Sequence, residues 1–305
     1  MKYIKLGVSD LKVSAVALGC MRIADLGTAK VENLIAAAMD CGINFFDHAD
    51  IYGGGRSETV FGEALQRGNL DRSRMILQSK CAIRSGFFDF SKKHILASTD
   101  GILSRLGVDY LDVLLLHRPD ALMEPEEVAE AFDRLYASGK VRYFGVSNQN
   151  PGQMELLRKY LKQPIVADQL QLSCACTTML DSGFNVNMTN AASIDHDNSA
   201  IEYCRLHDIT IQTWSSLQYG FFEGTFLGND RYAALNAVLA RIAEENGTTP
   251  AAVAIAWILR HPAHMQAIVG TTKPQRIREL AQAASVDLTR EQWYEIYRAA
   301  GNTLP

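Results

Sequence analysis

Short apolar runs alternate with longer amphipathic segments along nearly the whole sequence, and this alternation is typical of a parallel α/β fold. Each run has the length of a buried strand, and apolar residues at helical spacing follow it. The runs after the first dozen residues cover 15–18, 44–47, 75–79, 111–116, 143–146, 165–167, 209–213 and 266–269. Eight such units follow one another with no sign of two repeated halves or of a point where the strand order reverses, as an open sheet would have. They predict a closed (β/α)8 TIM barrel of the α/β class.

Local signals mark the starts of several helices. Proline and small polar residues suit the first turn or the N-cap of a helix, and Gln292 three residues after Thr289 adds a capping box. The expected starts are Ser57 as an N-cap, residue 91, Pro125, Asn150 with Pro151, Pro274 and Thr289. Residues 1–13 predict a β-hairpin ahead of the barrel. We therefore expect residues 1–305 to form one domain, a barrel with an N-terminal β-hairpin and extra C-terminal helices.

Two segments interrupt the alternation of strands and helices. Residues 173–199 are rich in Asn, Ser, Thr and Asp, and residues 220–230 carry glycines among aromatic residues. Long loops inside a compact domain are commonly functional. Both segments are therefore predicted as loops over an active site.

Composition and charge exclude several classes of function. Of the 305 residues, 48% are hydrophobic and 21% are charged, which is ordinary for a globular enzyme. The formal net charge is −4, so no basic surface for nucleic acid is expected. No apolar run approaches the roughly 18 residues that span a membrane, and the first residues contain no signal-peptide core. The sequence therefore predicts a cytoplasmic protein without a nucleic-acid or membrane partner.

Six cysteines lie mostly in apolar stretches, where free cysteine is commonly a small buried hydrophobe. Cys174 and Cys176 form the one close pair, and a single intervening residue is too few for a usual zinc knuckle. We expect free thiols in a reducing compartment and no metal site.

Polar or reactive residues stand where each predicted strand ends. In a (β/α)8 barrel the active site lies at the carboxyl ends of the strands, so these residues are expected to surround one site. From strand two to strand eight they are Asp47 with Tyr52, Lys80, His117, Ser147 with Asn148, Gln169, Trp214 with Ser215, and the run 270–273.

Asp47, Tyr52, Lys80 and His117 come from three neighbouring strands and suit acid catalysis. A phenol in water has a pKa of about 10 and is a weak acid near neutrality. A neighbouring ammonium is expected to lower the pKa of Tyr52, while the carboxylate of Asp47 holds Lys80 in its charged form. The imidazole of His117 can donate to the same substrate oxygen. Together they predict a general acid for an oxygen on which negative charge develops.

These motifs resemble those of the aldo-keto reductases over essentially the whole chain. The run Asp47-His48-Ala49-Asp50-Ile51-Tyr52-Gly53 has a highly specific spacing, and a strand-end lysine, a Leu-Leu-Leu-His run and a Gly-Val-Ser-Asn run follow in the family's order. The resemblance implies NADPH-dependent reduction of aldehydes or ketones to alcohols. It implies that Tyr52 is the proton donor, that Lys80 and Asp47 tune it, and that His117 orients the carbonyl substrate.

The same resemblance implies a nicotinamide cofactor along the strand ends. Its amide would lie near Ser147, Asn148 and Gln169, and Trp214 stands where the family stacks an aromatic ring on the nicotinamide. The segment 270–276 is similar to the family's adenosine-phosphate segment, and its two cations favour a 2′-phosphate, hence NADPH over NADH. The expected cofactor contacts are Cys20, Met21, Asp47, Ser147, Asn148, Gln169, Trp214, Ser215, Leu217, Gly270, Thr271, Thr272, Lys273 and Arg276.

Some neighbouring residues fit simpler roles. His48 should point away from Asp47 and is predicted to be a packing or solvent-facing residue. The glycines at 53–55 lack the phosphate-loop pattern and predict a turn. Phe87 and Phe88 suit an exposed turn or a wall of the substrate pocket equally well.

Two other functions fit parts of the sequence. A cofactor-binding regulatory subunit of the same fold would bind NADPH with little turnover. A metal-dependent barrel hydrolase could use Asp47, His48, Asp50 and His117 as ligands, but it would leave the strand-end tyrosine and lysine without a role. The sequence also ends soon after its last predicted helix, whereas many aldo-keto reductases have a longer tail, so an open pocket of broad specificity is expected.

Overall fold

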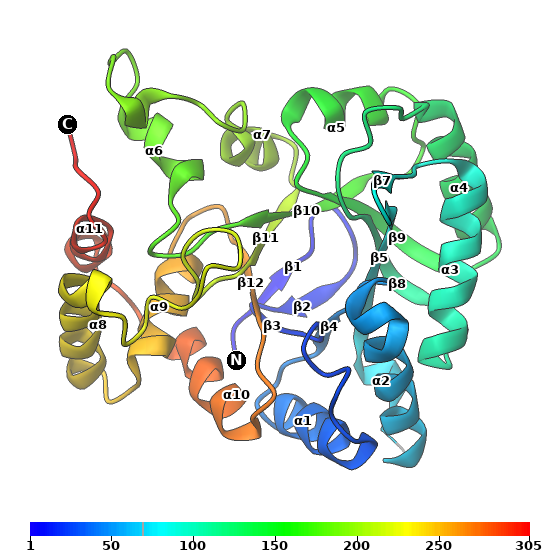
Figure 1. The fold of residues 1–305 in the computed structure, drawn as a ribbon, viewed down its shortest axis with the longest axis horizontal. Coiled ribbons are helices and arrows are strands. Elements are labelled where there is room, and N and C mark those ends of the chain that lie inside the picture. Colours follow the sequence, from blue (N-terminus) through cyan, green and yellow to red (C-terminus); the bar gives the residue numbers. More distant parts are fainter. Residues whose placement is uncertain (69) are drawn as a thin grey trace.

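A closed barrel of eight parallel strands lies at the centre of the fold (Figure 1). The computed structural model describes residues 1–68 and 70–305. The barrel strands are β3 (Val16–Gly19), β4 (Phe45–Asp47), β5 (Ile76–Cys81), β8 (Leu111–Leu116), β9 (Val141–Ser147), β10 (Ile165–Gln171), β11 (Thr210–Trp214) and β12 (Gln266–Val269). They follow one another around the barrel in sequence order, and β12 pairs with β3 to close it. The predicted (β/α)8 barrel is confirmed.

Helices cover the outer face of the barrel (Figure 1). They are α1 (Thr28–Asp40), α2 (Arg56–Arg67), α3 (Lys92–Leu106), α4 (Pro125–Ala137), α5 (Pro151–Arg158), α6 (Thr178–Phe184), α7 (Ala200–Leu206), α8 (Ala233–Glu245), α9 (Pro250–Leu259), α10 (Pro274–Ala281) and α11 (Arg290–Ala299). Short 3₁₀ turns are η1 (Tyr52–Gly55), η2 (Arg72–Arg74), η3 (Ala191–Ser193), η4 (Asp230–Tyr232) and η5 (Gln282–Ser285). The long helices are amphipathic and turn their apolar stripe toward the strands, as the sequence predicts.

The N-terminal hairpin closes the amino-terminal end of the barrel. Its strands β1 (Tyr3–Lys5) and β2 (Lys12–Ser14) pair antiparallel. Leu6, Leu11 and Val13 form one apolar cluster with residues inside the barrel such as Phe45. Since this end is filled with apolar side chains, the carboxyl ends of the strands are left for a site. A second small hairpin, β6 (Ile83–Arg84) with β7 (Phe87–Phe88), follows β5.

Two tryptophans join the C-terminal helices to the rest of the fold. The rings of Trp257 on α9 and Trp293 on α11 stack with centroids 4.9 Å apart. Each indole N–H donates to the other residue's backbone carbonyl at 3.0 Å. Both buried indoles are thus satisfied, as buried tryptophan requires. The capping boxes at Asn150 and Thr289 are also present.

Two local predictions are wrong. The helix α2 begins at Arg56 with Gly55 as its N-cap, so Ser57 lies inside the first turn, where its hydroxyl donates to the carbonyl of Met21 at 3.4 Å. Segment 173–199 contains α6 and η3 rather than only loop. Phe184 of α6 packs against three aromatic rings of α11, so this segment lies against the C-terminal helix.

Candidate active site

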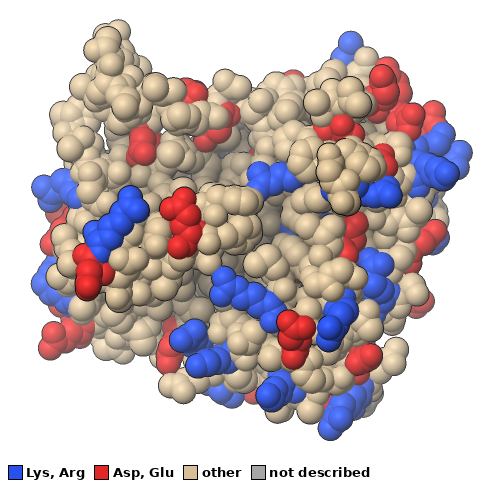
Figure 2. All heavy atoms as spheres, in the orientation of Figure 1, with Lys and Arg blue, Asp and Glu red and all other residues tan. Residues whose placement is uncertain are grey.

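A cavity of about 790 Å³ opens at the carboxyl ends of the barrel strands. Figure 2 shows a hollow near the centre of this face with basic side chains at its edge. Residues from β4, β10 and β11 and from the loops after β3, β8, β11 and β12 line the cavity. Asp47, Tyr52 and His117 lie in its wall, as predicted. The expected loop 220–230 contributes Phe221, Phe222, Thr225 and Leu227, whereas no residue of 173–199 lines the cavity, so the prediction for that segment is wrong.

A buried ammonium joins Asp47 to Tyr52. Lys80 is 0% exposed, and its Nζ donates to the carboxylate of Asp47 at 2.8 Å, to the carbonyl of His48 at 2.7 Å and to the hydroxyl of Tyr52 at 3.1 Å. All three N–H groups are therefore used. Burial alone would lower the pKa of Lys80, but attraction to Asp47 and Tyr52 outweighs burial and raises that pKa. Lys80 is thus held in its charged form beside the phenol near neutral pH.

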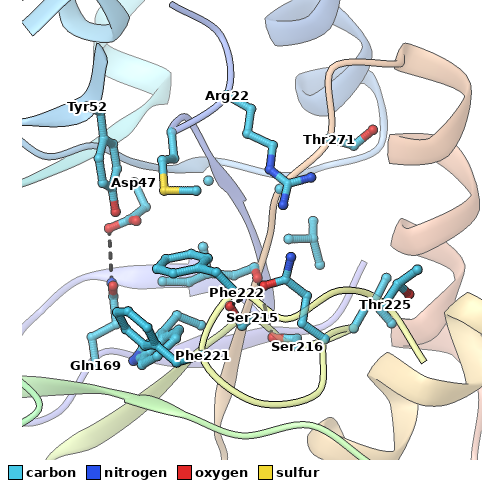
Figure 3. Close-up of a pocket in the computed structure, with 18 of the residues that line it drawn as sticks. Arg22, Asp47, Tyr52, Gln169, Ser215, Ser216, Phe221, Phe222, Thr225 and Thr271 are labelled. Carbon is cyan, nitrogen blue, oxygen red and sulfur yellow. Dashed lines mark hydrogen bonds between the residues drawn. The ribbon is translucent and has the colours of Figure 1, made fainter. Parts of the chain in front are cut away.

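The second carboxylate oxygen of Asp47 accepts two amide N–H groups. Gln78 Nε2 lies 2.7 Å from it and Gln169 Nε2 lies 3.0 Å from it; Figure 3 shows the bond to Gln169. Gln78 also donates to Gln212, which donates to Gln266. A chain of glutamines therefore crosses the barrel interior beneath the carboxylate. Sequence reasoning missed Gln78, Gln212 and Gln266, although a glutamine inside an apolar strand is a signal for a buried polar network.

The pKa of Tyr52 differs from the prediction. Burial raises it, and the opposing attraction of Lys80 is too small to bring it below its usual value. The expected lowering of this pKa is therefore wrong for the protein without ligands, because the partly buried phenol is poorly solvated. The rings of Tyr52 and His117 lie edge to face, with centroids 6.0 Å apart. Burial, followed by repulsion from Lys80 and Arg118, holds the pKa of His117 well below its usual value, so its imidazole is neutral.

A glycine turn positions Tyr52. Gly53, Gly54 and Gly55 all have positive φ, a region that favours glycine. A Cβ on Gly53 would lie 2.4 Å from Cβ of Ala24, and one on Gly55 would lie 2.9 Å from Cδ of Arg105. The turn can therefore pack against Ala24 and Arg105 only because positions 53 and 55 carry no side chain.

The buried carboxylate of Glu58 fixes the helix that follows this turn. Glu58 accepts two N–H groups of Arg105 at 2.7 and 2.8 Å and the hydroxyl of Ser79 at 2.6 Å. Ser79 precedes Lys80 on β5, so α2, α3 and the lysine strand are joined directly behind the site.

Most of the predicted cofactor contacts surround the cavity. Those that line it are Met21, Asp47, Ser147, Asn148, Gln169, Trp214, Ser215, Leu217, Gly270, Thr271 and Arg276. Cys20, Thr272 and Lys273 do not line it. The side chain of Cys20 is buried, and its backbone N–H donates to the carbonyl of Asp47 at 2.8 Å. Lys273 is exposed at the start of α10.

The lining fits a nicotinamide dinucleotide. Ser147, Asn148 and Gln169 supply hydroxyl and amide groups at one place, and the indole N–H of Trp214 donates to Asn148 at 3.2 Å. A Cβ on Gly270 would meet no atom within 4 Å, which leaves space beside the strand end. Arg276 on α10 adds a cation to the lining. An aromatic face, an amide-binding group and a cation are what the two ends of such a cofactor require.

The structure also decides the roles predicted for neighbouring histidine, acidic and aromatic residues. His48 is buried with its ring 4.4 Å from that of Phe61, so it is a packing residue as expected, and Asp50 accepts the hydroxyl of Ser98. Phe87 and Phe88 are exposed and do not line the cavity. Within residues 1–68 and 70–305, no group of three or more His, Cys, Asp or Glu could hold a metal ion, so the ligand set of the hydrolase alternative is not assembled.

Sequence reasoning also missed Arg118, which lies in the cavity wall beside His117. A cation directly after a strand-end histidine is its only sequence signal. In the part of the chain that the structure describes, no helix has the length and apolar character needed to span a bilayer.

Comparisons with known proteins agree with this fold. The model of the Aldo/keto reductase family matches residues 15–300. The chain is similar to the uncharacterized oxidoreductase YcsN of Bacillus subtilis, with 38% identity over 95% of both chains. It is 34% identical, over 97% of both chains, to 6-dehydroglucose reductase of Agrobacterium fabrum. A crystal structure of the thermostable aldo-keto reductase Tm1743 with the inhibitor epalrestat has the same fold, with a TM-score of 0.79 and 23% identity over 98% of this chain and 100% of that one.

Proposed function

Because this chain belongs to the Aldo/keto reductase family, we propose that it reduces aldehydes and ketones to alcohols with NADPH and with Tyr52 as the proton donor. Membership of the family makes the protein an NAD(P)H-dependent oxidoreductase that acts on small carbonyl compounds. The observation that carries the finer proposal is the chain of hydrogen bonds from Asp47 through Lys80 to the hydroxyl of Tyr52, which ends at the cavity.

In this proposal the residues act on the carbonyl oxygen. A bound reduced nicotinamide supplies the hydride. The O–H bond of Tyr52 breaks and its proton passes to the substrate oxygen, on which negative charge develops. The phenolate that remains lies beside the Lys80 ammonium, 3.1 Å away, and Asp47 keeps that ammonium in place. Neutral His117 donates one ring N–H to the same oxygen and so orients the substrate.

Arg276 supports NADPH as the preferred cofactor. It is exposed, lines the cavity, and forms no ion pair with residues 1–68 or 70–305, so its planar guanidinium can bind a 2′-phosphate bidentately. Arg276→Met should lower the ratio of kcat/KM for NADPH to that for NADH by roughly tenfold or more. Arg278→Met, an exposed arginine on the same helix outside the cavity, is the matched control and should keep the ratio.

The test of the function is NADPH oxidation with a panel of aromatic aldehydes and dicarbonyls, together with measurement of the dissociation constant for NADPH. Turnover of several carbonyls with micromolar NADPH affinity supports the proposal. Tight NADPH binding without turnover of any of them would instead favour a cofactor-binding regulatory protein. A failure to bind NADPH would contradict both functions.

Two broader expectations belong to the same proposal. Residues 1–305 are taken as one domain, since both ends of the sequence pack on one barrel. A cytoplasmic location is supported by six free cysteines, four of them buried, which suit a reducing compartment.

A further inference from the structure

Arg118 is a half-buried cation in the cavity wall, and no acidic residue among 1–68 and 70–305 forms an ion pair with it. It follows His117 at the end of β8 and lines the same cavity. Among residues 1–68 and 70–305, none of the ion pairs and none of the side-chain hydrogen bonds includes Arg118. A guanidinium carries five N–H donors and cannot lose its charge near neutrality. These donors are therefore available to a ligand in the cavity.

Two aromatic rings hold the guanidinium in place. Its central carbon lies 5.7 Å from the ring centroid of Trp214 and 5.5 Å from that of Phe221. These rings are themselves edge to face, with centroids 5.9 Å apart. Cation–π contacts of this kind fix a planar guanidinium without using its N–H groups. Burial also lowers the pKa of Arg118, which means that the surroundings disfavour the charge until an anion compensates it.

The other charged residues of the cavity wall are either exposed to solvent or already have a partner. Arg22 and Arg276 also line the cavity, but both are exposed and can be solvated; Figure 3 shows Arg22 projecting into the cavity from the segment after β3. The acids in the lining are Asp47, which Lys80 neutralises, and Glu279, which accepts an amide N–H of Gln275. The wall beside His117 therefore has an uncompensated positive charge.

We propose that Arg118 binds a carboxylate of the substrate, so that the preferred substrates are aldehydes or ketones that carry an acid group. This inference rests on the proposed function, since His117 would hold the carbonyl oxygen while the next residue holds the acid. A carboxylate matches the planar fork of a guanidinium bidentately. Trp214, Phe221 and Phe222 supply an apolar wall for the carbon skeleton between the two groups.

The kinetic test compares pairs of substrates that differ by one charge. The 2-, 3- and 4-carboxybenzaldehydes are each measured against the corresponding methyl ester. The native protein should show a higher kcat/KM for the acid in at least one pair. In Arg118→Met the acid-to-ester ratio for that pair should fall roughly 10- to 100-fold. Arg118→Lys should restore only part of it, because an ammonium cannot bind bidentately.

Arg74→Met is the control for net charge. Arg74 is exposed on η2, beside the amino end of β5 and thus away from the cavity, and its replacement should keep the acid-to-ester ratio. An equal ratio in the native protein and in Arg118→Met would overturn the inference. A large loss of NADPH affinity in Arg118→Met with an unchanged ratio would also overturn it, since Arg118 would then be a cofactor contact.

A binding measurement separates failure of this inference from failure of the proposed function. Calorimetry with benzoate and with neutral benzamide, each added to the protein with NADP⁺, needs no turnover. Benzoate should bind at least tenfold more tightly than benzamide, and Arg118→Met should remove the difference. If no aldehyde is reduced but this preference is present, the carboxylate site stands and the reductase proposal fails. If aldehydes are reduced and benzamide binds as well as benzoate, the carboxylate site is wrong and the reductase proposal stands.

Discussion

Removing one charge of the Asp47–Lys80 pair should destabilise the fold strongly, while removing both should cost much less than the sum. Both side chains are buried, with Lys80 0% and Asp47 2% exposed. In Asp47→Asn the Lys80 ammonium has only neutral acceptors, which are the carbonyl of His48, the hydroxyl of Tyr52 and the new amide oxygen. Leaving a buried charge without its partner costs about 3–5 kcal/mol. We expect a loss of this size for Asp47→Asn.

Lys80→Met should be less damaging. The carboxylate of Asp47 keeps the amide N–H groups of Gln78 and Gln169 on its other oxygen. We expect a loss at the lower end of the same range, about 3 kcal/mol. The double variant contains neither charge, so its loss should be smaller than the sum of the single losses by about 2 kcal/mol or more. Urea unfolding followed by circular dichroism measures each free energy.

The pH dependence of the unfolding free energy is an independent test, because its direction should differ between the native protein and Asp47→Asn. In the native protein the pKa of Lys80 is raised by its partners, so its contribution is complete below the unfolded pKa, about 10.4, and is lost as pH rises through the folded pKa. In Asp47→Asn the unpaired burial should depress this pKa, so that variant should become more stable as pH rises from 7 toward 10. Additive single losses, or an Asp47→Asn loss that does not shrink at pH 9.5, would refute the buried ion pair.

Two further variants test neighbouring groups. Burial raises the pKa of Asp168 to about 8, so the cost of this carboxyl to stability appears above its unfolded pKa of 3.8 and grows with pH. Asp168→Asn should therefore stabilise the fold by up to about 4 kcal/mol at pH 7 and by less at pH 5. A gain in urea unfolding that does not depend on pH would contradict this. Gln78→Leu removes one hydrogen-bond donor from Asp47 and should lower kcat several-fold. Gln78→Glu places a second carboxylate beside Asp47 and should also shift the pH profile of kcat/KM. Identical pH profiles for both variants and the native protein would show that Gln78 does not act on the site.

The sequence was sufficient for the barrel and for four residues that the structure brings together at one cavity, Asp47, Tyr52, Lys80 and His117. The strands are short apolar runs that stand out from the amphipathic segments between them. The spacing from Asp47 to Tyr52 and the strand ends at Lys80 and His117 are local features that a parallel barrel brings together. The expectation for Ser57 failed because Gly55, with its positive φ, is the N-cap, and the helix therefore begins two residues earlier than predicted. The long polar segment gave no sign that Phe184 would pack against α11, since that contact joins residues more than a hundred positions apart.

Energetic balances could not be read from residue types either. The effect of Lys80 on the Tyr52 pKa depends on how deeply the phenol is buried, which only the packing determines. Arg118 is an ordinary residue type for a strand end, and Gln78, although unusual inside an apolar strand, does not reveal its partner from the sequence. Their significance comes from what lies around them: two aromatic rings without a carboxylate in one case, and the carboxylate of Asp47 in the other.

The most direct measurement of the central claim is the rate of aldehyde reduction in a single turnover by Tyr52→Phe, with NADPH in excess of its dissociation constant. Phenylalanine keeps the ring beside His117 and removes only the hydroxyl that Lys80 contacts. We expect the reduction rate to fall roughly 10²- to 10⁴-fold while NADPH still binds. A rate within tenfold of the native rate would contradict Tyr52 as the proton donor.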